Sequence, residues 1–321
     1  MMRLRDIEPD DYARQVLPQT AALWAGRRDF GTYAAHTLEI ARSPYGRRHY
    51  RTAGLFDGAT MLASFKRYER VMHAGAHRLR AVGIGAVFTP PERRGHGYAS
   101  VMLGSELDRA RASGCDVAYL FSDIRPQFYA ALGFTELPSR EVSLRADGLP
   151  AARLNLAPLE ERDWDAVRRC FDRCERRRPA GFLRTPLAWD WMLMRMRQGS
   201  ERAGGQPTNL VVRRPGRGIS AYVLGARDPE RDAYALDEFG FADDAAAEIV
   251  PALLRAAAGD LRRVVGWLPP GSARELLPPG TVRKRRQAIF MAAPLSPAGA
   301  LAVSALAASA ASDPCWHADH I

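Results

Sequence analysis

A short glycine-bearing loop is the part of this sequence best suited to chemistry. It runs Arg94-Gly95-His96-Gly97-Tyr98-Ala99, just after a predicted strand and at the start of a predicted helix. The first N–H groups of a helix have no partner within the helix, and the helix dipole attracts negative charge. Glycine also lets the backbone approach a ligand closely. The loop therefore predicts a binding site for a phosphate-bearing ligand.

Two common nucleotide-binding motifs do not fit this loop. A Rossmann fingerprint needs a third glycine, where this sequence has Ser100, and a βαβ unit, where it has hairpin-linked strands. A Walker loop needs glycine followed by lysine and then serine or threonine, which this loop does not have. The phosphate ligand is therefore expected to belong to another class.

The residues around the loop carry a family resemblance. The run 87–99 resembles the central motif of the GCN5-related N-acetyltransferase (GNAT) superfamily, R/Q-x-x-G-x-G/A after a strand and a proline, with Arg94, Gly97 and Ala99 at its defined positions. Residues 128–134 resemble the family's FYxxxGF segment, which lies near the cofactor thiol. The resemblance implies an N-acetyltransferase that uses acetyl-CoA as co-substrate, with no metal, and transfers acetyl directly to an amine in a ternary complex.

The resemblance also implies which residues contact the cofactor. Pantetheine amides would pair with the central strand, the pyrophosphate would rest on the loop, and the end of the next strand would face them. The cofactor-binding residues expected on this basis are Val87, Phe88, Thr89, Arg94, Gly95, His96, Gly97, Tyr98, Ala99, Ser122 and Asp123. In the resembling segment Tyr129 points at the thioester sulfur and would protonate the leaving thiolate. The alternative for Tyr129 is a packed aromatic residue on a short helix.

The whole chain resembles a narrower group, the tandem acetyltransferases of the mycobacterial enhanced-intracellular-survival (Eis) type. That group pairs an active N-terminal unit with a degenerate second unit, and its last residue enters the active site, where the α-carboxylate acts as base. This sequence ends in an aromatic, histidine-bearing segment, whereas chain termini are usually polar and loose. We therefore predict that the terminal carboxylate of Ile321 is catalytic. The related protein has a further domain before its terminus, for which this chain has only a short tail.

Two alternatives to the terminal carboxylate stay open. The tail could be disordered, or His317 or His320 could be the base, because histidine titrates near neutral pH. The pair His317 and His320 could also form half of a metal site, but no third ligand is evident in the sequence.

Hydrophobic periodicity predicts alternating helices and strands in both halves of the chain. The predicted helices span 10–25, 32–42, 98–113, 126–132, 163–177, 186–197 and 244–258, and the predicted strands span 50–56, 60–68, 79–89, 117–122, 134–144, 209–214, 219–227, 233–241, 264–268 and 283–292. The strands 134–144 and 283–292 are expected to close the first and second sheet, respectively.

These elements give the predicted fold class and domain organisation. We expect an α/β protein with two tandem GNAT-like mixed, splayed sheets flanked by helices, followed by a short C-terminal tail. The predicted domains are 1–146 (N-terminal GNAT domain, catalytic and acetyl-CoA-binding), 147–292 (degenerate GNAT-like domain) and 293–321 (C-terminal helix and tail that reach the active site).

The composition limits the classes of binding partner that the chain is expected to have. The chain has 321 residues, 47% hydrophobic and 26% charged, with a net charge of +10. Such a balance fits nucleic acid, an anionic membrane or a polyanionic small molecule such as coenzyme A. Basic residues are interspersed with acidic ones, which disfavours nucleic acid. No signal peptide or membrane span is evident, so the cytoplasm is the expected location.

The acceptor cannot be named from the sequence. A small amine, a peptide N-terminus and a lysine side chain all stay open, as does a homo-oligomer. Two other functions compete with catalysis, a non-catalytic acyl-CoA-binding module and a nucleic-acid-associated protein. A polycationic acceptor would need an acidic pocket, for which Asp237, Glu238, Asp243 and Asp244 are the candidates.

Overall fold

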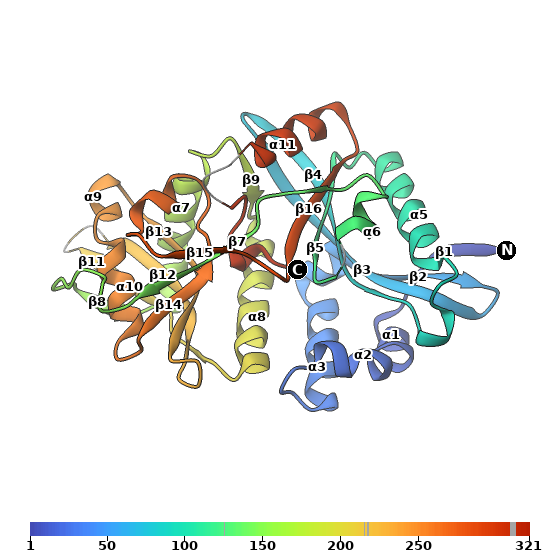
Figure 1. Cartoon of the computed structure of the whole chain (residues 1–321), viewed down its shortest axis with the longest axis horizontal. Coiled ribbons are helices and arrows are strands. Elements are labelled where there is room, and N and C mark those ends of the chain that lie inside the picture. Colours follow the sequence, from blue (N-terminus) through green and yellow to red (C-terminus); the bar gives the residue numbers. More distant parts are fainter. Residues whose placement is uncertain (125, 215, 217, 309–312) are drawn as a thin grey trace.

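The protein consists of two lobes, each built on a mixed sheet, with the C-terminus between them (Figure 1). The computed structural model describes residues 1–124, 126–214, 216, 218–308 and 313–321, without the side chains of residues 201 and 202. The fold-class prediction of two tandem, splayed, helix-flanked sheets is confirmed.

The first lobe has a sheet with the order β1-β2-β3-β4-β5-β16-β6, to which β9 adds beside β3. Its strands are β1 (Met2–Ile7), β2 (Tyr50–Asp57), β3 (Thr60–Ala74), β4 (His77–Phe88), β5 (Val117–Ser122), β6 (Thr135–Glu136), β9 (Ala180–Leu183) and β16 (Ile289–Pro294). The helices of this lobe are α1 (Pro9–Gln15), α2 (Leu17–Trp24), α3 (Phe30–Arg42), α4 (Pro44–His49), α5 (Tyr98–Ala112), α6 (Pro126–Ala130) and α11 (Pro297–Ala307).

The second lobe repeats this plan with the order β8-β11-β12-β13-β14-β7-β15, to which β10 adds beside β12. Its strands are β7 (Arg140–Arg145), β8 (Leu156–Pro158), β10 (Gln206–Pro207), β11 (Leu210–Arg214), β12 (Gly218–Asp228), β13 (Ala233–Phe241), β14 (Arg263–Trp267) and β15 (Thr281–Lys284). The helices are α7 (Trp164–Glu175), α8 (Pro186–Ala203), α9 (Asp244–Ala247) and α10 (Val250–Ala258). Short 3₁₀ turns lie at Pro91–Arg93, Glu161–Asp163, Gly271–Leu276 and His317–Asp319.

The two lobes exchange one strand. β16 comes from the C-terminal half but lies antiparallel to β5 in the first sheet, whereas β7 comes from the N-terminal half and lies antiparallel to β14 in the second. The expected closing strands 134–144 and 283–292 are therefore wrong as single strands. The first divides at residues 137–139, which include Pro138, and the second at residues 285–288, which include Ala288 (φ 51°), and the two parts of each join different sheets. Strand pairing thus crosses the expected boundaries at 146/147 and 292/293, and the domain limits stay a prediction.

Each sheet opens beside its central strand. β4 runs parallel to β5 only over Ala81–Ile84, and β13 runs parallel to β14 only over Ala233–Leu236. The register against the strand on the other side then shifts, at Ala86 (φ 48°) in β4 and between Leu236 and Glu238 in β13. A bulge bends its strand and disrupts pairing, so each sheet splays into a V at this level.

Candidate active site

The loop before α5 has an anion-binding geometry. Gly95 (φ 80°) and Gly97 (φ 75°) adopt left-handed backbone conformations, and Gly97 is the N-cap of α5. A Cβ built at either glycine would meet no atom within 4 Å, so the outer side of the loop is open. No described side chain caps α5, and its first turn carries no acidic residue. The first N–H groups of this helix therefore face an open site that suits phosphate.

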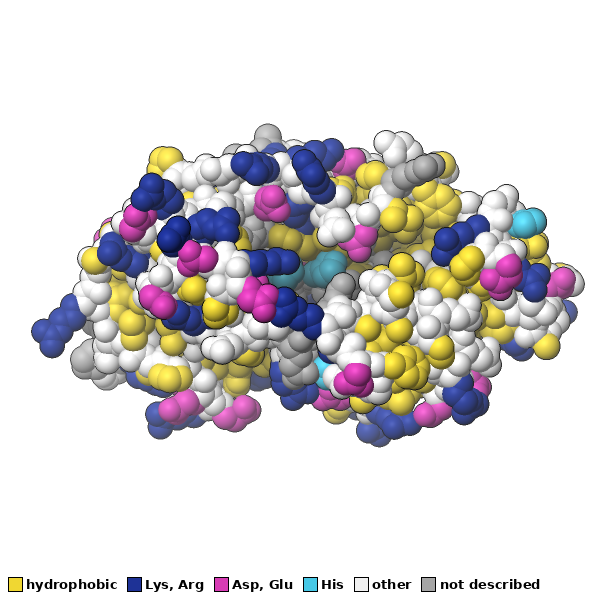
Figure 2. Space-filling view, turned by 60° about the horizontal axis from the view of Figure 1, so that its bottom comes forward, with side chains coloured by type: hydrophobic (Ala, Val, Ile, Leu, Met, Phe, Trp, Pro, Cys, Tyr) yellow, Lys and Arg dark blue, Asp and Glu magenta, His cyan; other side chains and the backbone are white. Residues whose placement is uncertain are grey.

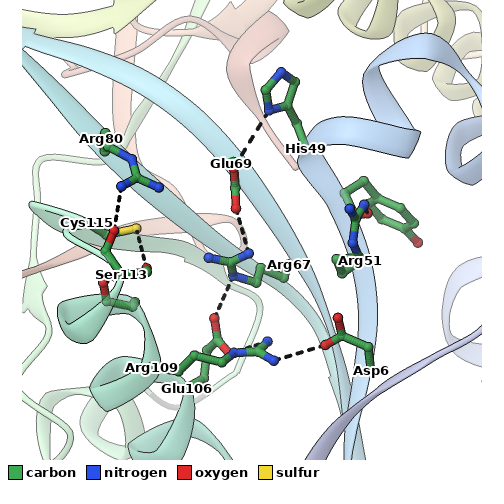
Figure 3. A network of polar contacts seen from close by, with 12 residues as sticks. Asp6, His49, Arg51, Arg67, Glu69, Arg80, Glu106, Arg109, Ser113 and Cys115 are labelled. Atoms are coloured by element: carbon green, nitrogen blue, oxygen red, sulfur yellow. Dashed lines mark hydrogen bonds and ion pairs between the residues drawn. The ribbon is translucent and has the colours of Figure 1, made fainter.

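Helix α5 is held in place by a buried ion-pair network (Figure 3). Glu106 on α5 is fully buried and binds Arg67 of β3 (Nε–Oε1, 2.8 Å) and Arg109 (Nη2–Oε2, 2.6 Å). Arg109 also reaches Asp6 of β1 (3.0 Å). Burial raises the pKa of Glu106, while the two guanidinium groups oppose that rise. The network ties the helix to the sheet, which sets the position of the loop at its N-terminus.

The residues expected to bind cofactor lie at the loop and along the first splay. Val87 and Phe88 lie in β4 beyond Ile84, the last residue paired with β5, so no described strand pairs with the β5-facing edge of β4 at these residues. The Nε of Arg94 donates to the carbonyl oxygen of Thr89 (3.2 Å), which closes the loop onto the end of β4. His96 stacks on Tyr98, with ring centroids 5.5 Å apart.

Two other expected cofactor residues lie at the end of β5, Ser122 as its last residue and Asp123 directly after it. The hydroxyl of the buried Ser122 donates to the carbonyl of Ile124 (2.6 Å). The carboxylate of Asp123 accepts the backbone N–H of Ala288 (2.8 Å), at the turn before β16. These bonds hold the end of β5 to the exchanged strand, across the splay from β4.

Tyr129 lies on α6 and packs between Phe128 and Phe134 at ring-centroid distances of 4.9 and 6.2 Å. Burial, followed by the negative charge of Asp123, raises the pKa of its phenol to about 12. The phenol therefore stays protonated at neutral pH and can donate. Tyr129 is not among the described residues that line the neighbouring pocket, whereas Asp123 is.

The last residue of the chain lies in the first splay. A Cβ at Gly83 would come within 2.6 Å of Tyr119 Cζ and 2.7 Å of Ile321 Cδ1, so β4 needs glycine there to make room for the Tyr119 ring and for the tail. A Cβ at Gly85 would lie 4.0 Å from the terminal carboxyl carbon. The terminal carboxyl group thus lies against β4 where β4 and β5 separate.

A buried network anchors the tail. Asp319 binds Arg70 of β3 (2.9 Å) and the Nε and Nη2 of Arg184, which follows β9 (both 3.0 Å). Arg184 also binds Glu238 of β13 (2.6 Å), so the network joins both lobes. Burial alone would raise the pKa of Asp319, but Arg184 and Arg70 hold it below its usual value. Removal of one partner would leave an uncompensated buried charge, a severe penalty.

A pocket of about 200 Å³ adjoins the tail end, between the lobes. It is lined by α2, α3 and the segment between them, by β3 and β4, by the end of β5, by α8 and by the last two residues. The lining residues are Trp24, Arg28, Tyr33, His36, Thr37, Ile40, Lys66, Tyr68, Gly85, Ala86, Phe121, Asp123, Arg195, Gln198, Gly199, His320 and Ile321. The surface is also hollowed between the lobes on the face shown in Figure 2, where basic side chains and histidines gather.

The two tail histidines occupy different splays. His317 pairs through Nδ1 with Asp237, just past the parallel part of β13 and β14, and its ring lies 5.0 Å from that of Trp267. His320 lines the pocket of the first lobe and packs edge-on against Phe121 (4.9 Å). Of the two alternative bases, His320 therefore lies nearer the expected chemistry.

Two further findings concern the described residues alone. Within them no group of three or more His, Cys, Asp or Glu side chains is arranged to hold a metal ion. None of the described helices combines the length and apolar character that crossing a membrane requires.

Comparisons with known proteins agree with this geometry. Residues 12–137 match the family model of the acetyltransferase (GNAT) domain. A search of curated proteins found no significant match. Among solved structures, a GCN5-related N-acetyltransferase from Anabaena variabilis has a TM-score of 0.72 at 13% identity, covering 92% of this chain and 73% of that one.

Two other structures have similar folds. A GCN5-related N-acetyltransferase from Kribbella flavida has a TM-score of 0.70 at 17% identity, covering 94% of this chain and 74% of that one. Eis1 from Mycobacterium abscessus has a TM-score of 0.61 at 13% identity, covering 92% and 74%. At these identities the likeness concerns the fold, and the family match supplies the activity class. Residues 12–137 thus match the acetyltransferase (GNAT) domain, and the chain as a whole shares its two-lobed fold with these GCN5-related N-acetyltransferases.

Proposed function

We propose that this protein is an N-acetyltransferase that passes an acetyl group from acetyl-CoA directly to an amine held in the pocket between the lobes. The observation that carries the proposal is the position of Ile321. Its carboxyl group lies at Gly85 in the splay of the GNAT domain and lines the pocket. A base is therefore available where the family match predicts acyl transfer.

The residues present fit coenzyme A. The uncapped N-terminus of α5 and the open glycine loop suit a pyrophosphate, and the free edge of β4 at Val87 and Phe88 suits pantetheine amides. When bound, acetyl-CoA supplies an activated thioester. The chain itself has to orient the acceptor and move two protons.

In this proposal a different group of the chain carries out each of the two proton transfers. The carboxylate of Ile321 takes a proton from the acceptor ammonium, so that the amine nitrogen can form the new C–N bond as the C–S bond breaks. Tyr129 gives its phenolic proton to the leaving sulfur, or holds that sulfur by a hydrogen bond. The raised pKa of about 12 keeps Tyr129 in the protonated form that this role needs.

Removal of the terminal carboxylate tests the proposal. Deletion of His320 and Ile321 should lower turnover by about 100-fold or more, because general base catalysis typically contributes that much. Thiol release from acetyl-CoA with a panel of primary amines gives turnover, and calorimetry gives cofactor affinity, which should not change.

A matched variant separates the carboxylate from the side chain. Ile321→Ala keeps the terminal carboxylate and should retain most of the turnover, whereas the deletion should not. Equal turnover in the wild type and in the deletion variant would rule out both the terminal carboxylate and His320 as the base. If the deletion lowers turnover, His320→Ala, which keeps the terminal carboxylate, shows which of the two groups is responsible. Binding of acetyl-CoA without thiol release for every amine would instead indicate a non-catalytic binding module.

A further inference from the structure

One basic residue of the pocket stands apart from its neighbours. Lys66 is one of only two lysines in a chain with 46 basic residues, and it lies in β3 with its side chain 9% exposed. Successive residues of a strand point to opposite faces. Arg67 accordingly points to the α5 side and pairs with Glu106 and Glu69, whereas Lys66 lines the pocket.

Lys66 has no anionic partner in the part of the chain that the structure describes. No described carboxylate lies within ion-pair distance of its Nζ, and the nearest recorded contact is the Tyr12 ring at 5.6 Å. Burial, followed by the positive charges of Arg195 and Arg28, lowers the pKa of Lys66 to about 7. A cation in such a place is costly unless a ligand neutralises it.

Arg195 of α8 adds a second cation to this side of the pocket. It is half-buried, its Nη1 donates to the carbonyl oxygen of His320 (3.0 Å), and no described carboxylate pairs with it. The carboxylates that line the pocket are Asp123 and the terminus of Ile321. The pocket is thus bipolar, with cations on β3 and α8 and carboxylates at the end of β5 and at the tail.

We propose that the acceptor is a small zwitterion, an amine that carries a carboxylate, as in an α-amino acid. Its ammonium group faces the terminal carboxylate of Ile321, and its carboxylate binds Lys66 and Arg195. A pocket of about 200 Å³ suits a molecule of this size. This inference rests on the proposed acetyl transfer and names the substrate class for it.

The acidic residues that a polycationic acceptor would need are already in use. Glu238 is fully buried against Arg184 and Tyr222, and Asp237 pairs with His317. Asp243 and Asp244, the other two candidates, bind the side chains of Arg214 and Arg177. All four carboxylates therefore already have a basic or hydroxyl partner within the chain.

Matched pairs of acceptors test the inference. We would measure thiol release from acetyl-CoA with α-amino acids and with their decarboxylated counterparts, for example phenylalanine with phenethylamine and lysine with cadaverine. After correction for the fraction of free amine, kcat/KM should favour the amino acid by about 10- to 100-fold, as expected for a charge-assisted hydrogen bond. Lys66→Met should remove most of that preference, because kcat/KM for the amino acid should fall far more than kcat/KM for the decarboxylated amine.

The other lysine provides the control. Lys284 is exposed on β15, pairs with Glu136 and lies outside the pocket lining, so Lys284→Met should keep the full preference. Equal use of both members of each pair, or a preference that survives in Lys66→Met, would overturn the zwitterion inference and leave the acetyltransferase proposal intact.

Two further outcomes complete the test. Transfer to the decarboxylated amines only from a carboxylate-bearing donor such as succinyl-CoA would place the anion on the acyl group and overturn the inference. An absence of thiol release with both members of every pair, and with every other amine, would overturn the acetyltransferase proposal and the inference together.

Discussion

The two lobes share one plan but end their central strands differently. In the first lobe β4 leads into a glycine loop, and α5 begins at Gly97 with no described side chain as cap. In the second lobe β13 leads into α9, whose N-cap Asp243 accepts the N–H of Ala246 (2.8 Å) and pairs with Arg214. The second lobe thus places its own carboxylate where the first lobe leaves room for a phosphate.

The strand beside each splay shows a second difference. At the last pair before the bulge, Gly85 of β4 lies opposite Lys66, whereas Leu236 of β13 lies opposite Gly225. The C-terminal tail enters both openings, with His317 in the second and Ile321 in the first. The two lobes thus share a fold, whereas within the described residues the helix that starts at a glycine without a side-chain cap and the buried lysine beside the bulge both belong to the first lobe.

The largest effect should come from giving the first lobe the cap of the second. Gly97→Asp introduces a carboxylate at the N-terminus of α5 and a side chain at a left-handed backbone position. We expect acetyl-CoA to bind about 1,000-fold more weakly, because two negative charges would compete for one site. Calorimetry measures this, with Gly104→Ala in the same helix as control. Unchanged affinity would show that the pyrophosphate does not bind at this loop.

The next effect concerns Lys66 and pH. Because burial lowers its pKa to about 7, the folded protein binds fewer protons than the unfolded chain between about pH 7 and 10. The free energy of unfolding therefore rises with pH across that window. The full penalty for burying the Lys66 cation is present below pH 7. Lys66→Met should raise the free energy of unfolding by about 3 kcal/mol at pH 6, with a smaller gain at pH 10. Denaturant titration measures this, and a gain independent of pH would contradict it.

A smaller effect is expected from the proposed acid. Tyr129→Phe should lower kcat by about 100-fold with little change in acetyl-CoA affinity. The control is Tyr234→Phe in β13 of the second lobe, where the hydroxyl donates to the carbonyl of Thr208 (2.9 Å), and this variant should keep normal turnover. Because the raised pKa of Tyr129 is about 12, no alkaline loss of activity from this group should occur below about pH 11. Full activity of Tyr129→Phe would mean that the residue only packs.

The smallest effect should come from the cap of the second lobe. Asp243→Ala removes an N-cap and an ion pair with Arg214, which should cost about 1 kcal/mol of stability. Thermal unfolding measures the cost. Turnover should stay the same, since Asp243 lies outside the proposed active site, and loss of turnover would mean that the second lobe takes part in the chemistry.

Local signals let the sequence predict the fold class and the anion loop. The glycine loop and the segment 128–134 are contiguous, so their residue types and spacing can be recognised without knowledge of the fold. The break of helix 10–25 into α1 and α2 was missed, although Pro18 sits at the start of α2. β1 was also missed, because its residues are mostly charged and its pairing with β2 is distant in sequence.

The features that could not be predicted from the sequence depend on contacts between residues far apart in the chain. The exchange of β7 and β16 depends on partners in the other half of the chain, which hydrophobic periodicity does not report. The anchor of the tail joins Asp319 to Arg70 and Arg184, 249 and 135 residues away. Lys66 was overlooked for the same reason, although a lysine in an arginine-rich chain was a signal that could have singled it out.

The stoichiometry of acetyl-CoA binding tests the comparison of the two lobes most directly. Calorimetric titration of the full-length protein should give one acetyl-CoA per chain, and Gly97→Asp should reduce this to no measurable binding. Two molecules per chain, or one that persists in Gly97→Asp, would contradict the assignment of the anion site to the first lobe alone.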